Sequence, residues 1–145
     1  KVAELVHELE YWGVTVIGAN CGNGPSEIER VLWEMAQAKP AGVVLMAQSN
    51  AGLPRWHGGE ISYDGTPEVM AGYAQRMRAL GARVIGACCG STPEHLRAMR
   101  LALDGPPLAA YEPAFVTAEA MGEAGDVRVR SRRTARRAPQ AEEVG

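Results

Sequence analysis

The sequence predicts an α/β fold built on parallel strands, and two observations carry this prediction. Residues 14–17, 42–47 and 83–86 are short apolar runs rich in β-branched side chains, without the polar alternation of a strand that has one wet face. Each run is followed by a loop and then by apolar residues at helical spacing. Strands and helices that alternate through short loops form right-handed βαβ units, as in open doubly wound sheets and (β/α)8 barrels.

Helix signals flank the first of these strands. Residues 1–12 carry apolar side chains at helical spacing, and Gly13 is expected to end that helix. A second helix is predicted over residues 26–38, where Ser26 and Glu29 have the spacing of a capping box. The first predicted strand therefore lies between two helices.

The second half of the pattern repeats the same order. After the second strand, residues 55–65 look irregular. Thr66 and Pro67 have the chemistry of a helix start, Gly81 ends that helix, and residues 92–104 form the last one. The side chains expected to face inward from these two helices are Val69, Met70, Tyr73, Met77 and Leu80, and Leu96, Met99 and Leu103.

All three cysteines follow a predicted strand and precede a predicted helix. Cys21 comes after the first strand, and Cys88 and Cys89 come after the third. Because the carboxyl ends of parallel strands meet at one edge of a sheet, we expect the three sulfurs to lie together. Neighbouring residues of a strand point to opposite faces, but Gly86 and Gly90 permit the change of direction that turns both sulfurs the same way.

Three thiolates in one place favour zinc among the common cellular ions. Three protein ligands leave a fourth position open, which is typical of a catalytic zinc site. His57, His95 and His7 are the histidines that could close it, and His57 is the best placed because it lies in a loop region. A site with three cysteinates favours attack by a metal-held substrate thiolate on an electrophilic carbon over hydrolysis by bound water.

Other interpretations of these residues stay open. Cysteines at strand ends can be buried small apolar residues, and adjacent cysteines can form a strained disulfide or serve a thiol-redox function. The chain could also be an inactive fragment with a structural role. Gly22-Asn23-Gly24 precedes a helix, as phosphate-binding loops do, but matches no phosphate-loop motif, so we interpret it as a turn.

Composition narrows the class of protein. A chain of 145 residues with 46% hydrophobic residues has the profile of one globular unit, and its net charge of −2 does not indicate a nucleic-acid partner. No apolar run approaches the roughly 18 residues of a membrane span.

Three cysteines, two of them adjacent, favour a reducing compartment, so we expect a cytoplasmic protein. Because the chain opens at Lys1 inside helix-like sequence, we expect an N-terminal part to be missing.

The pattern of strands and helices fades after Asp104. We therefore divide the chain into residues 1–104 and an irregular tail over residues 105–145. Within that tail, residues 126–137 hold six arginines and one aspartate. Since aromatic residues are not interleaved with them, we expect a disordered solvated tail rather than an RNA-binding segment.

Three motifs resemble those of the homocysteine S-methyltransferase family. Gly-Ala-Asn-Cys at residues 18–21 is similar to the first zinc-ligand motif of the family, and Gly-Ala-Cys-Cys-Gly at 86–90 to its paired-ligand motif, which usually has glycine where Ala87 stands. Asn-Ala-Gly-Leu-Pro at 50–54 resembles the loop between them, with Ser49 in place of a proline. The three motifs follow one another in the order of the family.

The resemblance implies a fold and a reaction. It covers about residues 1–104 and implies the C-terminal portion of a (β/α)8 barrel, about three βα units. It also implies zinc held by Cys21, Cys88 and Cys89, with Asn20 and Asn50 near the substrate. Such a protein would transfer a methyl group to the thiol of homocysteine to form methionine.

The methyl donor and the partners follow from the same resemblance. Residues 90–95 are more similar to the cobalamin-dependent members than to the betaine-dependent ones, so methylcobalamin or methyltetrahydrofolate is the expected donor system, with betaine and S-methylmethionine as alternatives. A separate corrinoid protein is the corresponding partner. Three barrel strands leave unpaired edges, which predicts association with another copy.

Overall fold

The computed structural model describes residues 1–39 and 41–116 of the chain. The chain divides into a unit over Lys1–Pro113 and a second unit that begins at Ala114. The helices and strands named below belong to the first unit. Residues 117–145, which include the arginine-rich segment of the predicted tail, lie outside the described residues.

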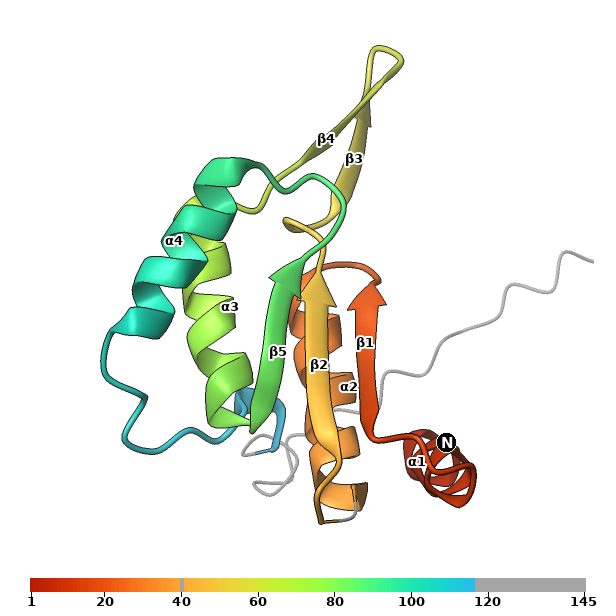
Figure 1. Cartoon of the computed structure of the whole chain (residues 1–145). Coiled ribbons are helices and arrows are strands. Elements are labelled where there is room, and N and C mark those ends of the chain that lie inside the picture. Colours follow the sequence, from red (N-terminus) through yellow and green to blue (C-terminus); the bar gives the residue numbers. More distant parts are fainter. Residues whose placement is uncertain (40, 117–145) are drawn as a thin grey trace, which may run out of the picture. The chain divides into compact units, whose positions relative to one another are not determined.

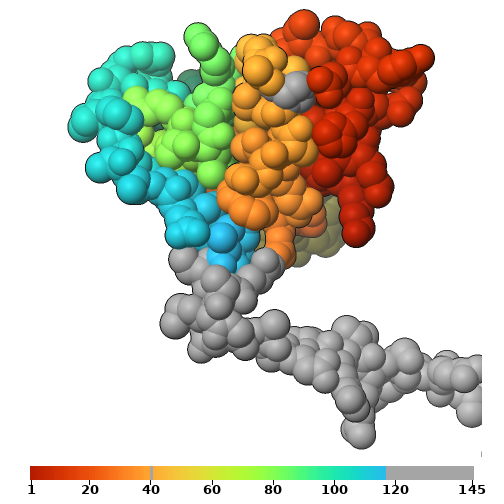
Figure 2. Space-filling view, turned by 90° about the horizontal axis from the view of Figure 1, so that it is seen from below, coloured from red at the N-terminus to blue at the C-terminus, as the bar shows by residue number. Residues whose placement is uncertain are grey.

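The core of the first unit is a parallel sheet, as the sequence predicts. Its strands are β1 (Val16–Cys21), β2 (Val44–Ser49) and β5 (Ala82–Ala87), in the order β1-β2-β5 (Figure 1). Strands that are consecutive along this βα pattern are therefore neighbours in the sheet. Figure 2 views the molecule from the end opposite the carboxyl edge. From this side the surface runs in chain order, from the red N-terminal segment through orange and green to the blue segment.

The first strand lies further along the chain than the pattern predicts. It begins at Val16 and continues through Gly18 to Cys21. A Cβ atom at Gly18 would overlap the carbonyl oxygen of Met46, so glycine lets β1 lie close against β2 at this point. The β-branched run alone could not show that a segment containing glycine and asparagine continues the strand.

The sheet buries one face within the described part of the chain. On β2, Leu45, Ala47 and Ser49 are buried, while the alternating Val44, Met46 and Gln48 are only half-buried. This alternation differs from the two-sided burial that the apolar runs predict. The helices that follow the strands supply the cover for the buried face.

Within the described first unit, four helices accompany this sheet: α1 (Val2–Tyr11), α2 (Pro25–Ala38), α3 (Pro67–Ala79) and α4 (Pro93–Asp104). No helix within residues 1–39 and 41–116 is long and apolar enough to cross a bilayer. The predicted inward faces of α3 and α4 are largely correct, except that Val69 and Leu96 are exposed. The buried apolar core consists of Val6, Ile17, Ile28, Leu32, Met35, Leu45, Ala47, Ala51, Met70, Tyr73, Ala74, Met77, Ala82 and Met99.

Glu29 does not form the predicted capping box. The helix α2 begins after Gly24 and has no side-chain cap. Glu29 is instead buried, where it accepts hydrogen bonds from Nε of Arg76 at 2.9 Å and from the hydroxyl of Tyr111. Its carboxylate thus joins α2 to α3 and to the segment after α4.

Residues that look irregular in the sequence form a β-hairpin. The strands β3 (Pro54–His57) and β4 (Glu60–Tyr63) pair antiparallel across Gly58 and Gly59, which both have positive φ, and the hairpin extends from the carboxyl edge of the sheet (Figure 1). Asp64 anchors its base by accepting hydrogen bonds from the Leu53 N–H and from Arg55.

Candidate metal centre

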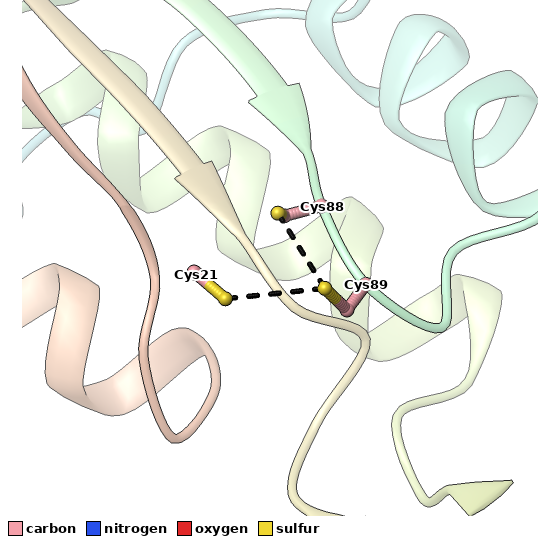
Figure 3. Close-up of side chains that lie close together, drawn as sticks. All are labelled: Cys21, Cys88 and Cys89. Atoms are coloured by element: carbon pink, nitrogen blue, oxygen red, sulfur yellow. Dashed lines mark hydrogen bonds between the residues drawn. The ribbon is translucent and has the colours of Figure 1, made fainter. Parts of the chain in front are cut away.

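The three cysteine sulfurs lie together at the carboxyl edge of the sheet (Figure 3). Sγ of Cys89 is 3.8 Å from Sγ of Cys88 and 3.9 Å from Sγ of Cys21, and all three sulfurs lie within 4.8 Å of one another. Sulfurs around a tetrahedral zinc ion, each about 2.3 Å from the metal, are about 3.8 Å apart. The donor type and the spacing both fit such an ion.

The backbone at Cys21 is unusual. Its φ of 69° makes it the one non-glycine residue with positive φ among residues 1–39 and 41–116. This left-handed conformation costs a cysteine roughly 1–3 kcal/mol, and such strain is found preferentially at functional sites. Gly22 follows with a φ of 66°, so two successive left-handed residues turn the chain from β1 into the loop before α2.

A tight turn directs Cys88 and Cys89 to the same site. The N–H of Cys88 donates to the carbonyl of Ser49 on β2 at 2.7 Å. The N–H of Ser91 donates to the carbonyl of Cys88 at 3.3 Å and closes the turn. Gly90 is the third residue of that turn and has a φ of 75°. The strand alternation therefore ends at Cys88, and both sulfurs face Cys21.

Asn50 lies between the two cysteine-bearing segments. Its side chain donates to the carbonyl of Gly22 at 2.7 Å and accepts from the N–H of Cys89 at 3.1 Å. It is buried, with 4% of its surface exposed. Asn20, by contrast, is exposed on β1 directly before Cys21.

Tyr63 is a residue of this site that the sequence does not single out. It ends β4, and its ring contacts Gly90 so closely that a Cβ atom there would overlap it. Burial raises the pKa of the Tyr63 phenol, and the sulfur of Cys89 raises it further by its charge and by accepting a hydrogen bond. The hairpin carries Tyr63 to the cysteines, so a hairpin prediction is the signal that could have found it.

The three thiols influence one another's acidity. Partial burial raises the pKa of Cys88, but the backbone N–H of Cys89, the neighbouring thiols and the side-chain amide of Asn20 donate hydrogen bonds to its sulfur. The net effect is a pKa of Cys88 below the usual value for a thiol. Hydrogen bonding to the sulfurs of Cys88 and Cys21, together with their charge, raises the pKa of Cys89. A bound cation would lower the pKa of all three thiols, because it stabilises their thiolate forms.

No histidine within the described residues joins the sulfur cluster. His7 is exposed on α1, and His57 is exposed at the turn end of β3. His95 is buried, and its Nδ1 accepts the N–H of Thr92 at 3.0 Å while its Nε2 lies 2.9 Å from the carbonyl of Gly65. This histidine therefore joins the start of α4 to the loop before α3.

The sulfur cluster is partly accessible to solvent, because Cys89 is exposed while Cys21 and Cys88 are half-buried. Cys89 and Asn20 are both exposed. A cavity of about 410 Å³ beside the rim is lined by Asn23, Asp64, Arg76 and other residues, but by none of the cysteines. A small molecule can therefore reach the sulfurs without entering that cavity.

The substitution Gly90→Ala tests the packing around the turn. We expect it to lower the free energy of unfolding by about 2 kcal/mol, because alanine is strained at positive φ and its methyl group displaces the Tyr63 ring. Chemical denaturation measures this effect. Adding Tyr63→Ala to the variant should recover the steric part of the loss; a strictly additive double variant would contradict the contact.

The fold and the site define an α/β protein with a three-cysteine cluster at the carboxyl ends of its parallel strands. The sequence model of one protein family, described as Homocysteine S-methyltransferase, matches residues 1–103. That match covers most of the chain, and the chain belongs to the homocysteine S-methyltransferase family.

Two curated relatives support this assignment. The methionine synthase of Mycobacterium leprae (strain TN) is 33% identical over 107 residues, which are 71% of this chain and 8% of the relative. The methionine synthase of Mycobacterium tuberculosis (strain ATCC 25618 / H37Rv) is 30% identical over 107 residues, which are 71% of this chain and 9% of the relative. The chain thus spans less than a tenth of the length of these relatives.

Proposed function

We propose that this chain is part of a zinc-dependent methyltransferase that transfers a methyl group to the thiol of L-homocysteine to form methionine. The observation that carries the proposal is the group of three cysteine sulfurs within 4.8 Å of one another at the rim of the sheet. Membership of the homocysteine S-methyltransferase family supports the same reaction.

In this proposal Cys21, Cys88 and Cys89 hold the zinc ion. When bound, zinc keeps the thiol of homocysteine deprotonated at neutral pH and so makes it a nucleophile toward the methyl group. The chain supplies three soft anionic ligands and leaves room for a fourth at the exposed rim. Because the three cysteinates exceed the charge of the ion and give the site a net negative charge, a further thiolate keeps more of its nucleophilic electron density.

Asn20 and Asn50 are the proposed residues near the amino-acid substrate. Asn20 is exposed on the strand that leads into Cys21, so its amide can contact the polar end of a molecule at the cysteines. Asn50 is buried beneath the same site, with hydrogen bonds to Gly22 and Cys89. Asn20 is therefore the better candidate for direct contact.

We further propose that residues 1–104 belong to a (β/α)8 barrel, as the C-terminal portion of about three βα units. Strands that neighbour one another in chain order favour a barrel, because an open doubly wound sheet reverses its strand order at the ligand site. Half-buried side chains on one face of β2 are compatible with a barrel interior. The exposed edges could instead be covered by another copy of the chain.

The donor system that we propose is methylcobalamin with methyltetrahydrofolate, delivered by a corrinoid protein. The similarity of residues 90–95 to the cobalamin-dependent members of the family favours it over betaine and S-methylmethionine. Three free thiols in one cluster favour a reducing compartment, so we propose a cytoplasmic location.

Calorimetric titration of L-homocysteine into the zinc-loaded full chain tests the proposal. We expect binding that disappears after zinc is removed by a chelator, because the substrate sulfur would occupy the fourth position of the metal. L-Homoserine, which has a hydroxyl in place of the thiol, is the matched control and should bind far more weakly. Equal binding of homocysteine to zinc-loaded and zinc-free protein would contradict the proposal.

A further inference from the structure

We propose that Asn50 is a positioning residue for the metal centre: its amide fixes the distance between the segment that carries Cys21 and the turn that carries Cys89. The inference rests on the proposed function and deepens it. It assigns Asn50 a role through the cysteines rather than through the substrate.

Both ends of the Asn50 amide are engaged by backbone groups of the two cysteine segments. Nδ2 donates to the carbonyl of Gly22, the residue directly after Cys21, at 2.7 Å. Oδ1 accepts from the N–H of Cys89 itself at 3.1 Å. With 4% of its surface exposed, Asn50 makes these bonds away from competing water.

The neighbouring backbone shows why such a bridge is needed. The N–H of Ala51 donates to the carbonyl of Cys89 at 2.9 Å, so the end of β2 already holds the Cys89 turn. On the other side, the pairing of β1 with β2 ends at Cys21 opposite Ser49. Beyond that pair the chain turns away through left-handed residues, and the Asn50 amide reaches across to Gly22.

The chemistry of the side chain matches this position. Bridging a carbonyl on one side and an N–H on the other requires one donor and one acceptor on a short planar group, which asparagine has. Aspartate has nearly the same shape but offers no donor to Gly22. Leucine has the same number and branching of side-chain heavy atoms but offers neither group.

Cobalt(II) titration of the full chain, monitored by absorption, tests the proposal with Co²⁺ as the probe. The near-ultraviolet charge-transfer intensity per bound Co²⁺ reports how many thiolates bind the metal. We expect Asn50→Leu to weaken Co²⁺ binding by about 10- to 100-fold, the usual effect of losing an outer-shell partner, and to lower the intensity per metal. The matched control Asn23→Ala alters an exposed asparagine of the loop that follows Cys21 and should change neither quantity.

Asn50→Asp tests the inference without relying on the fold of the leucine variant. This variant keeps an acceptor for Cys89 and loses the bond to Gly22, so Cys21 should be the sulfur that leaves the metal. Alkylation of the Co²⁺-loaded variant, followed by mass spectrometry, should then label Cys21 while Cys88 and Cys89 stay protected.

Three protected cysteines and an unchanged intensity per metal in the Asn50 variants would overturn the inference. The same result with weaker homocysteine binding would assign Asn50 to the substrate instead. If the unaltered chain gives no thiolate charge-transfer band with Co²⁺, the proposed function and this inference both fail. A band in the unaltered chain that persists in both variants removes the inference alone.

Discussion

Cys21→Ala is expected to weaken zinc binding by more than about 100-fold, because loss of a ligand should exceed the 10- to 100-fold effect of losing an outer-shell partner. Two thiolates from one turn would remain, with no third sulfur to complete the set. Competition with a chromophoric chelator under reducing conditions measures the affinity. Zinc binding that survives the substitution would contradict the role of Cys21.

A second variant at this position separates the sulfur from the backbone. Cys21 has a φ of 69°, so Cys21→Gly removes the thiol and also relieves the left-handed strain. We expect both variants to lose zinc, and the metal-free glycine variant to be more stable than the metal-free alanine variant by about 1 kcal/mol. Equal stabilities in denaturant would show that Cys21 carries no strain.

Leu45→Ala is expected to lower the free energy of unfolding by about 3 to 4 kcal/mol. Leu45 is fully buried in β2, the central strand of the sheet, so the substitution leaves a cavity between the sheet and the helices. Urea denaturation followed by circular dichroism measures the effect. The metal-free protein should be used, so that metal binding does not add to the apparent stability.

Leu101→Ala is the matched control for this experiment. It removes the same atoms from α4, where 66% of the Leu101 surface is exposed. We expect a change within about 0.5 kcal/mol, as for most surface substitutions. Similar losses for the two variants would contradict the placement of the core around β2.

The order of strands and helices could be predicted because the local chemistry is strong. The β-branched runs indicate the three strands of the sheet, and helix-start residues such as Thr66 and Pro67 indicate the helices. The ends of β1 could not be predicted, because the strand includes Gly18, whose place is decided by contact with Met46 on another strand. Local propensity does not contain that information.

The hairpin was not predicted because its two strands contain little of the usual signal. Four-residue strands with exposed faces show no apolar alternation, so the sequence around Gly58 and Gly59 looks irregular. The pair Trp56 and Ile61, opposite each other in the register, is the feature that could have indicated it.

The cysteines of the candidate site could be predicted because topology alone places strand ends at one edge. The contact of Tyr63 with Gly90 and the two hydrogen bonds of Asn50 depend on distances across loops, which one sequence does not provide. The motif around Asn50 indicated that the residue matters. It did not indicate that the amide joins the two cysteine segments.

X-ray absorption at the zinc edge of the purified full chain tests the central claim most directly. The proposal predicts one zinc ion with three sulfur neighbours at about 2.3 Å, and a fourth sulfur after L-homocysteine is added. A zinc ion surrounded by nitrogen and oxygen, or a chain that retains no zinc under reducing conditions, would contradict it.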